Sequence, residues 1–195
     1  MYALDLKGFG SNAGMEFPYS LSDYVNEVRE YMKENAIVRP FVIAHSFGAR
    51  IAIKLAAEDS RAFLKIALCG AAGLKPRFSL KKACKCTVFK VLKRVVKRER
   101  LQKFYSKDYQ SLSPVMKESF VKIVNERLET AAERIETPTV LIFGDKDGET
   151  PVYMGRAYNK RIRGSKLYII KGAGHFAFVD RPREFCEIIR EFFSE

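Results

Sequence analysis

The sequence has no run of about 18 apolar residues, and its N-terminus lacks the basic-then-apolar order of a secretory signal. It therefore predicts neither a membrane-spanning helix nor a signal peptide. Only four cysteines occur among the 195 residues, at irregular spacing, which excludes a disulfide framework and favours the reducing cytoplasm. We expect no structural metal, because Cys84 and Cys86 have no second cysteine pair and both histidines lie far away in sequence.

Acidic residues are almost absent from one segment. Residues 75–107 hold 13 Lys and Arg but a single acid, Glu99, whereas the rest of the chain balances 22 basic against 22 acidic residues. The net charge of +12 thus belongs to one segment of an otherwise neutral protein. We interpret this segment mainly as a solvated helix face; attraction of an anionic substrate and contact with an acidic membrane surface are the alternatives. Nucleic acid is not an expected partner, because no recognised DNA- or RNA-binding module is present.

Short apolar runs alternate with helical patterns, which indicates an α/β fold with a mostly parallel sheet and flanking helices. A capping box at Ser20 and Asp23 begins one helix, and Pro182 begins the last. The expected strands are residues 2–6, 41–45, 63–70, 139–145 and 166–172.

The alternation stops between about 73 and 134, where two amphipathic helical patterns follow each other. The second begins with Ser113 as N-cap and Pro114 in the first turn. We interpret this block as an inserted helical lid. The expected organisation is therefore 1–72 for the first part of the core, 73–134 for the lid and 135–195 for the second part of the core.

Ser46 stands between the apolar run "FVIA" and the helical pattern "FGARIAIKLAAE". A serine at a sharp strand-to-helix turn is the setting of a catalytic nucleophile, and the small residues Ala44 and Gly48 allow such a turn. The backbone N–H of Phe47, at the start of the helix, is then placed to stabilise an oxyanion.

A serine nucleophile needs a base, and the chain contains only two histidines. His45 adjoins Ser46, so we expect its side chain to point away from the reacting face and to pack in the protein. His175, in the loop after the last strand, is the candidate base. Between Ser46 and His175 in chain order, the loop "GDKDGETP" offers Asp147 to orient the imidazole, whereas we expect Asp145 to cap the turn.

These motifs resemble the α/β-hydrolase superfamily, in particular its small bacterial enzymes with a lid. The matching residues are "DLKGFGSN" (5–12), "AHSFGA" (44–49), "GDKDGETP" (144–151) and "GAGHF" (172–176). The resemblance implies a carboxylesterase-like hydrolase with a Ser-His-Asp triad of Ser46, His175 and Asp147. Members normally carry further strands and an oxyanion loop before the first of these motifs. We therefore expect this chain to be a truncated form or a fragment of a longer enzyme, and a functional natural miniature is the alternative.

The resemblance leaves the substrate open. Small esters or related acyl compounds are our first expectation, and Phe104, Tyr105, Met116 and Phe120 of the lid are candidates to line the acyl pocket. Carbon–carbon bond hydrolysis of an anionic diketone and an inactive fragment that binds through its basic lid are the alternatives. The sequence does not give the oligomeric state.

The loop after residues 2–6 also imitates a dinucleotide-binding fingerprint, with Gly8, Gly10 and Ala13 in the glycine positions. That fingerprint requires a helix that opens at the third small residue, but Gly14 and Pro18 keep the loop open until about Ser20. We therefore expect no nucleotide and no other cofactor.

Overall fold

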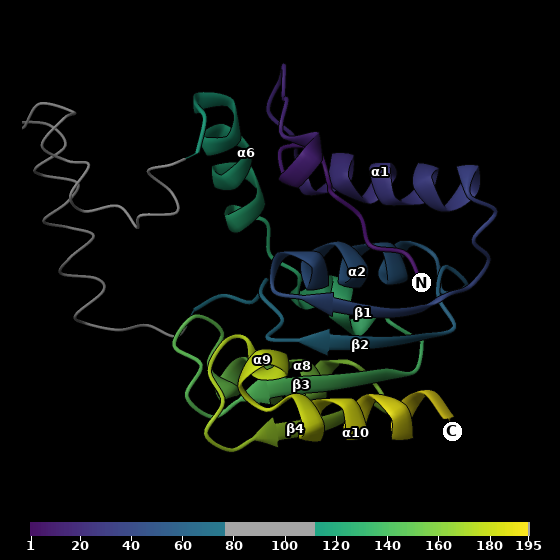
Figure 1. The fold of residues 1–195 in the computed structure, drawn as a ribbon, viewed down its shortest axis with the longest axis vertical. Helices are drawn as coiled ribbons and strands as arrows, with labels where there is room; N and C mark the ends of the chain where they lie inside the picture. Colours follow the sequence, from purple (N-terminus) through teal and green to yellow (C-terminus); the bar gives the residue numbers. More distant parts are fainter. Residues whose placement is uncertain (77–111, 195) are drawn as a thin grey trace, which may run out of the picture.

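Four parallel strands form one sheet in the computed structural model, which describes residues 1–76 and 112–194 (Figure 1). The strands lie in the order β1-β2-β3-β4. Their bounds are β1 (Phe41–His45), β2 (Lys65–Cys69), β3 (Thr139–Gly144) and β4 (Lys166–Ile170). All three pairings are parallel, so every strand ends at the same edge of the sheet. This confirms the expected α/β fold class and four of the five expected strands.

The strand expected at residues 2–6 is wrong. These residues pair with no strand of the sheet, and residues 2–5 are exposed. Their apolar character is not sufficient, because a strand is stable only where a neighbouring strand satisfies its backbone groups. Among the described strands, β1 consequently has one partner, and Phe41 and Ile43 are about half exposed. The following loop contains a short 3₁₀ helix, η1 (Gly10–Asn12), and no helix opens at Ala13, unlike the dinucleotide-binding arrangement.

Helices cover both faces of the sheet because the side chains of its strands alternate between two apolar cores. Ile66 and Leu68 of β2 face one core, and Ala67 and Cys69 face the other. The first core is shared with α1 (Leu21–Glu34), α2 (Phe47–Glu58), α7 (Glu129–Glu133) and α8 (Val152–Arg161). The second is shared with α9 (Ala177–Asp180) and α10 (Pro182–Ser194). The sheet is thus the middle layer of three (Figure 1).

The helix starts follow the sequence closely. Ser20 and Asp23 form the expected capping box of α1, in which each side chain accepts a hydrogen bond from the other residue's backbone N–H. Ser113 caps α6 (Pro114–Asn125) by accepting a hydrogen bond from the Met116 N–H. The other end of α6 is held by Arg50 of α2, which is buried and donates hydrogen bonds to the carbonyl oxygens of Ile123 and Glu126.

The lid stays a prediction. Of the interval 73–134, residues 77–111 lie outside the described part of the chain, and with them most of the basic segment and the candidates Phe104 and Tyr105.

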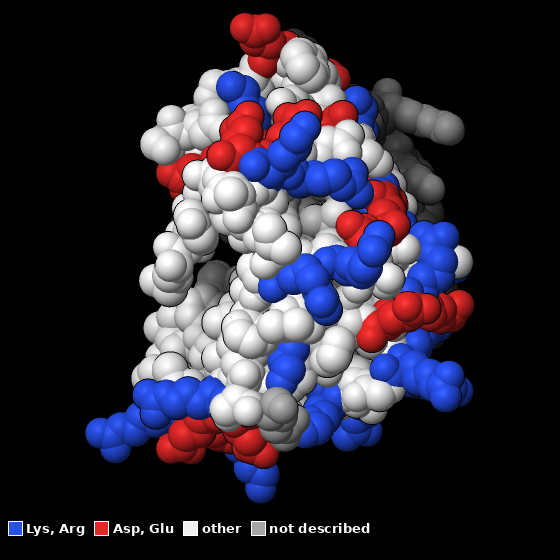
Figure 2. Space-filling model, turned by 90° about the vertical axis from the view of Figure 1, so that its right-hand side faces the viewer, with Lys and Arg blue, Asp and Glu red and all other residues white. Residues whose placement is uncertain are grey.

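None of the described helices is long and apolar enough to cross a membrane. On the face that carries the amino ends of the strands, basic and acidic side chains are intermixed, as the balanced charge outside 75–107 predicts (Figure 2).

Candidate active site

Ser46 is the single residue between β1 and α2, and its backbone is strained. Its φ of 48° and ψ of −104° are unusual for a residue with a side chain. Such a conformation costs about 1–3 kcal/mol and persists only where the surroundings impose it. Here the end of β1, the start of α2 and a 3.0 Å hydrogen bond from the Ser46 N–H to the Cys69 carbonyl fix the turn. The side chain does not cap α2, so its hydroxyl is available for chemistry.

The start of α2 presents backbone N–H groups beside Ser46. Phe47 is the first residue of the helix, and the first N–H groups of a helix have no partner within it. They also lie at the positive end of the helix dipole, which favours a negative charge. The Phe47 N–H thus lies at the start of a helix directly after Ser46, and its role toward an oxyanion stays a prediction.

His175 and Asp147 come from the loops that follow β4 and β3, and their side chains meet. The Nδ1 atom of His175 lies 2.8 Å from Oδ2 of Asp147, and both side chains are almost fully buried. Thr150 donates its hydroxyl to the same Oδ2 at 2.6 Å. The backbone N–H groups of Glu149 and Thr150 donate to Oδ1, each at 2.8 Å. Asp147 is thus held rigidly with one oxygen directed at the imidazole.

These hydrogen bonds keep Asp147 ionised. Burial alone would raise the pKa of its carboxyl group, but the hydrogen bonds from Thr150, from His175 and from the two backbone N–H groups outweigh it and hold the pKa below its ordinary value. An ionised carboxylate accepts from His175 Nδ1–H, which leaves Nε2 free to accept a proton.

Asp145, the other acid of this loop, has a different position. It is exposed, and its Oδ1 accepts a 2.7 Å hydrogen bond from the Gly172 backbone N–H. It therefore ties the loop after β3 to the loop after β4, whereas we expected it to cap its own turn.

His45 does not point away from the site, contrary to our expectation. Its ring lies 4.6 Å from the His175 ring, and its Nε2 is 2.9 Å from the His175 carbonyl oxygen. This contact joins residues 130 positions apart in the chain, which a sequence pattern does not reveal. Burial lowers the pKa of His45, so near neutral pH it is uncharged and donates its Nε2–H to that carbonyl. His45 thus helps to hold the loop that carries His175.

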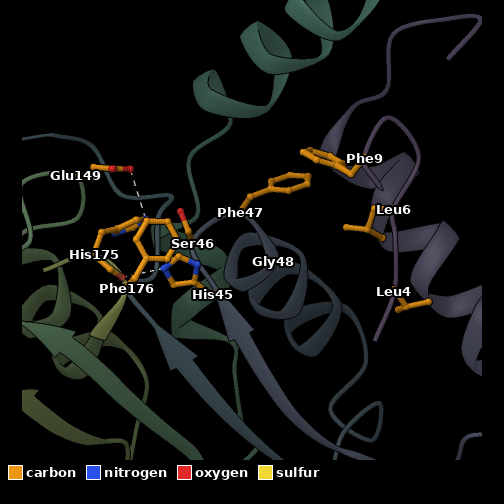
Figure 3. Close-up of a pocket in the computed structure, with 10 residues that line it drawn as sticks. All are labelled: Leu4, Leu6, Phe9, His45, Ser46, Phe47, Gly48, Glu149, His175 and Phe176. Carbon is orange, nitrogen blue, oxygen red and sulfur yellow. Dashed lines mark hydrogen bonds and ion pairs between the residues drawn. The ribbon is translucent and has the colours of Figure 1, made fainter. Parts of the chain in front are cut away.

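A cavity of about 500 Å³ opens beside Ser46 and His175 (Figure 3). Its lining is mainly apolar, with Phe47 and Phe176 close to the serine and the N-terminal segment on the opposite side. The lid candidates Met116 and Phe120 are not among its described lining residues: Met116 packs near Gly8 and Tyr24, and Phe120 is exposed. The lining consists of Leu4, Leu6, Phe9, His45, Ser46, Phe47, Gly48, Glu149, His175 and Phe176.

A carboxylate lies near His175 Nε2 in this structure. Within the described residues no hydrogen bond joins that nitrogen to Ser46, and its nearest charged neighbour is Oε2 of Glu149 at 3.5 Å. Catalytic hydrogen bonds are often long in the unliganded state and tighten when substrate binds. Sequence reasoning missed Glu149, because only the folded loop brings it to the imidazole. The same described residues contain no group of three His, Cys, Asp or Glu side chains arranged to hold a metal ion.

Gly70, at the end of β2, has no side chain, and the imidazole of His175 occupies the space that a side chain would fill. A Cβ atom there would lie 3.2 Å from His175 Nδ1 and 3.2 Å from Thr150 Oγ1, and Gly70 has a φ of +49°. We expect Gly70→Ala to lower kcat by about tenfold or more, because small misplacements of a catalytic group have large effects on rate. Gly164→Ala is the matched control, since its φ is +74° but nothing lies within 4 Å of the added carbon. Both variants are expected to lose about 1 kcal/mol of stability. Equal kcat values for the two variants would show that Gly70 does not position His175.

Comparison with known proteins agrees with this fold. A model of the "Alpha/beta hydrolase family" matches residues 1–188. An esterase from Exiguobacterium antarcticum superposes with a TM-score of 0.75 at 18% identity, covering 97% of this chain and 80% of that one. A putative non-heme bromoperoxidase, BpoC, from Mycobacterium tuberculosis gives a TM-score of 0.74 at 19% identity, covering 97% of this chain and 79% of that one.

Sequence similarity to curated proteins is more local. A pimeloyl-[acyl-carrier protein] methyl ester esterase of Neisseria meningitidis is 35% identical over 60 residues, which are 31% of this chain and 23% of that protein. This chain thus aligns with about a quarter of that relative's length. The family model, by contrast, extends over nearly the whole chain and includes Ser46, Asp147 and His175. This chain belongs to the α/β hydrolase family.

Proposed function

We propose that this protein is a serine hydrolase that cleaves small carboxylic esters or related acyl substrates. The observation that carries the proposal is the convergence of three strand ends. A strained Ser46 and a His175 bonded to a buried Asp147 line one cavity, and each residue follows a different strand of the parallel sheet. The methyl ester esterase of Neisseria meningitidis, matched over a short stretch, supports ester substrates.

In this mechanism Ser46 Oγ attacks the carbonyl carbon of the ester while His175 Nε2 accepts the hydroxyl proton. The carbonyl oxygen becomes an oxyanion that accepts a hydrogen bond from the Phe47 N–H. The intermediate then expels the alcohol, to which His175 returns the proton, and an acyl group remains on Ser46. Water, deprotonated by His175, releases the acid and regenerates the serine. In both steps Asp147 stabilises the imidazolium of His175 by accepting a hydrogen bond from its Nδ1–H.

The test is turnover of nitrophenyl esters of short and medium acyl chains, with acid quenching during turnover and peptide mass spectrometry. We expect release of nitrophenolate and an acyl group on the peptide that contains Ser46. Folded protein that hydrolyses none of these esters, or that carries the acyl group on another residue, would contradict the proposal. Turnover of a diketone without turnover of any ester would instead favour carbon–carbon bond hydrolysis.

A further inference from the structure

We propose that Glu149 makes this site select against anionic acyl groups and in favour of neutral and cationic ones. The inference rests on the proposed function. The juxtaposition that carries it is a carboxylate beside the catalytic nitrogen, the single one among the described lining residues of a mainly apolar cavity: Glu149 Oε2 lies 3.5 Å from His175 Nε2 (Figure 3).

The position of Glu149 is fixed by the catalytic loop itself. Its backbone N–H donates a 2.8 Å hydrogen bond to Asp147 Oδ1, and the N–H of the next residue, Thr150, donates to the same oxygen. The backbone of Glu149 therefore cannot move without disturbing the carboxylate that orients His175. Its side chain is 72% exposed, so it lies at the mouth of the cavity, in contact with water.

Among the described lining residues, none carries a Lys or Arg side chain that would offset this charge. Of the ten described lining residues, Glu149 is the only Asp, Glu, Lys or Arg. His175 lies beside it, and the other histidine of the lining, His45, is uncharged near neutral pH because burial lowers its pKa. Five of the remaining residues have aliphatic or aromatic side chains, namely Leu4, Leu6, Phe9, Phe47 and Phe176. At the described residues of the cavity, a substrate at Ser46 therefore meets mainly apolar side chains and the carboxylate of Glu149.

The consequence differs with the charge of the substrate. A carboxylate on a short acyl chain would lie within a few ångströms of the Glu149 carboxylate, in contact with solvent. At that separation in a water-rich setting, repulsion lowers kcat/KM by about three- to tenfold at low salt, and a cationic group is favoured by a similar factor. From the sequence alone, the basic segment left open that the protein attracts anionic substrates. The described residues of the cavity do not provide such an attraction.

The experiment compares three nitrophenyl esters of similar shape, derived from butyrate, from hydrogen succinate and from trimethylammonio-butyrate. The enzymes are the intact chain, Glu149→Gln and Glu136→Gln. Glu136 is an exposed glutamate just before the amino end of β3, so its replacement changes the net charge equally but far from the site. Ratios of kcat/KM between esters cancel any effect of Glu149 on His175 that all three substrates share.

We expect Glu149→Gln to raise kcat/KM for the anionic ester and to lower it for the cationic ester, each by about three- to tenfold relative to the neutral ester. Glu136→Gln should leave both ratios unchanged, and about 0.5 M salt should shrink the effect of Glu149. If all enzymes hydrolyse the neutral ester but Glu149→Gln leaves the ratios unchanged, the inference is overturned while the proposed function stands. If none hydrolyses any ester, the proposed function itself fails, and the inference with it.

Discussion

Replacement of Ser46 by alanine is expected to lower kcat for ester hydrolysis by about 10⁴-fold or more. The variant loses the only oxygen in the proposed mechanism that can carry the acyl group. The cavity, the Phe47 N–H and the His175–Asp147 pair stay in place, so a small residual rate above the uncatalysed reaction is expected. The measurement is steady-state turnover of nitrophenyl butyrate, with thermal unfolding to show that the variant is folded.

Ser22→Ala is the matched control for this experiment. Ser22 is an exposed serine on α1, and its replacement likewise removes one serine hydroxyl, here from the protein surface. It should retain full activity. Because alanine keeps the Cβ atom that strains residue 46, Ser46→Ala should unfold within a few degrees of the parent protein. A folded Ser46→Ala variant with undiminished turnover would remove the nucleophile from the proposed mechanism.

Replacement of Asp147 by asparagine is expected to lower kcat by about 10⁴-fold while the shape of the side chain is kept. An amide oxygen is a weaker acceptor for the His175 Nδ1–H, and an amide nitrogen in that place turns the imidazole to the wrong tautomer. The neighbouring variant Asp145→Asn is the control. Among the described residues its carboxylate accepts from the Gly172 N–H alone, so we expect its kcat to change by no more than about twofold. Equal losses in the two variants would mean that the loop as a whole, rather than Asp147, supports catalysis.

The same variant has a signature in the pH dependence of stability. Because the folded-state pKa of Asp147 is held below its ordinary value, its ionised form stabilises the fold above the unfolded pKa of about 4. This contribution is lost as the pH falls through the folded-state pKa. Asp147→Asn should therefore be less stable than the parent near neutral pH, and the difference in the free energy of unfolding should narrow below about pH 4. Denaturant titrations at several pH values measure it.

The sequence predicted those features that depend on neighbouring residues. The strand ending at His45, the helix beginning at Phe47 and the cap at Ser113 are set by local patterns of apolar and capping residues, and the structure contains all three. The placement of Asp147 and His175 at one edge follows from a topological rule: parallel strands end together, so their loops meet.

The predictions that were wrong, and the residues that were missed, depend on partners distant in the sequence. Residues 2–6 have the composition of a strand but do not pair with any strand of the sheet. His45 contacts the carbonyl of His175, 130 residues away. Glu149 and Gly70 have no local signal at all: one is an acid in a polar loop and the other a glycine after a strand. Only the fold shows that both lie against the imidazole of His175.

Labelling with a fluorophosphonate probe tests the central claim most directly, because such probes react with serines that an adjacent base activates. The protein and its Ser46→Ala variant would be treated in parallel and the adduct located by peptide mass spectrometry. A phosphonyl group on Ser46, absent from the variant and from Asp147→Asn, is the predicted result. Folded protein that stays unlabelled, or that is labelled at another serine, would contradict the assignment of Ser46 as the nucleophile.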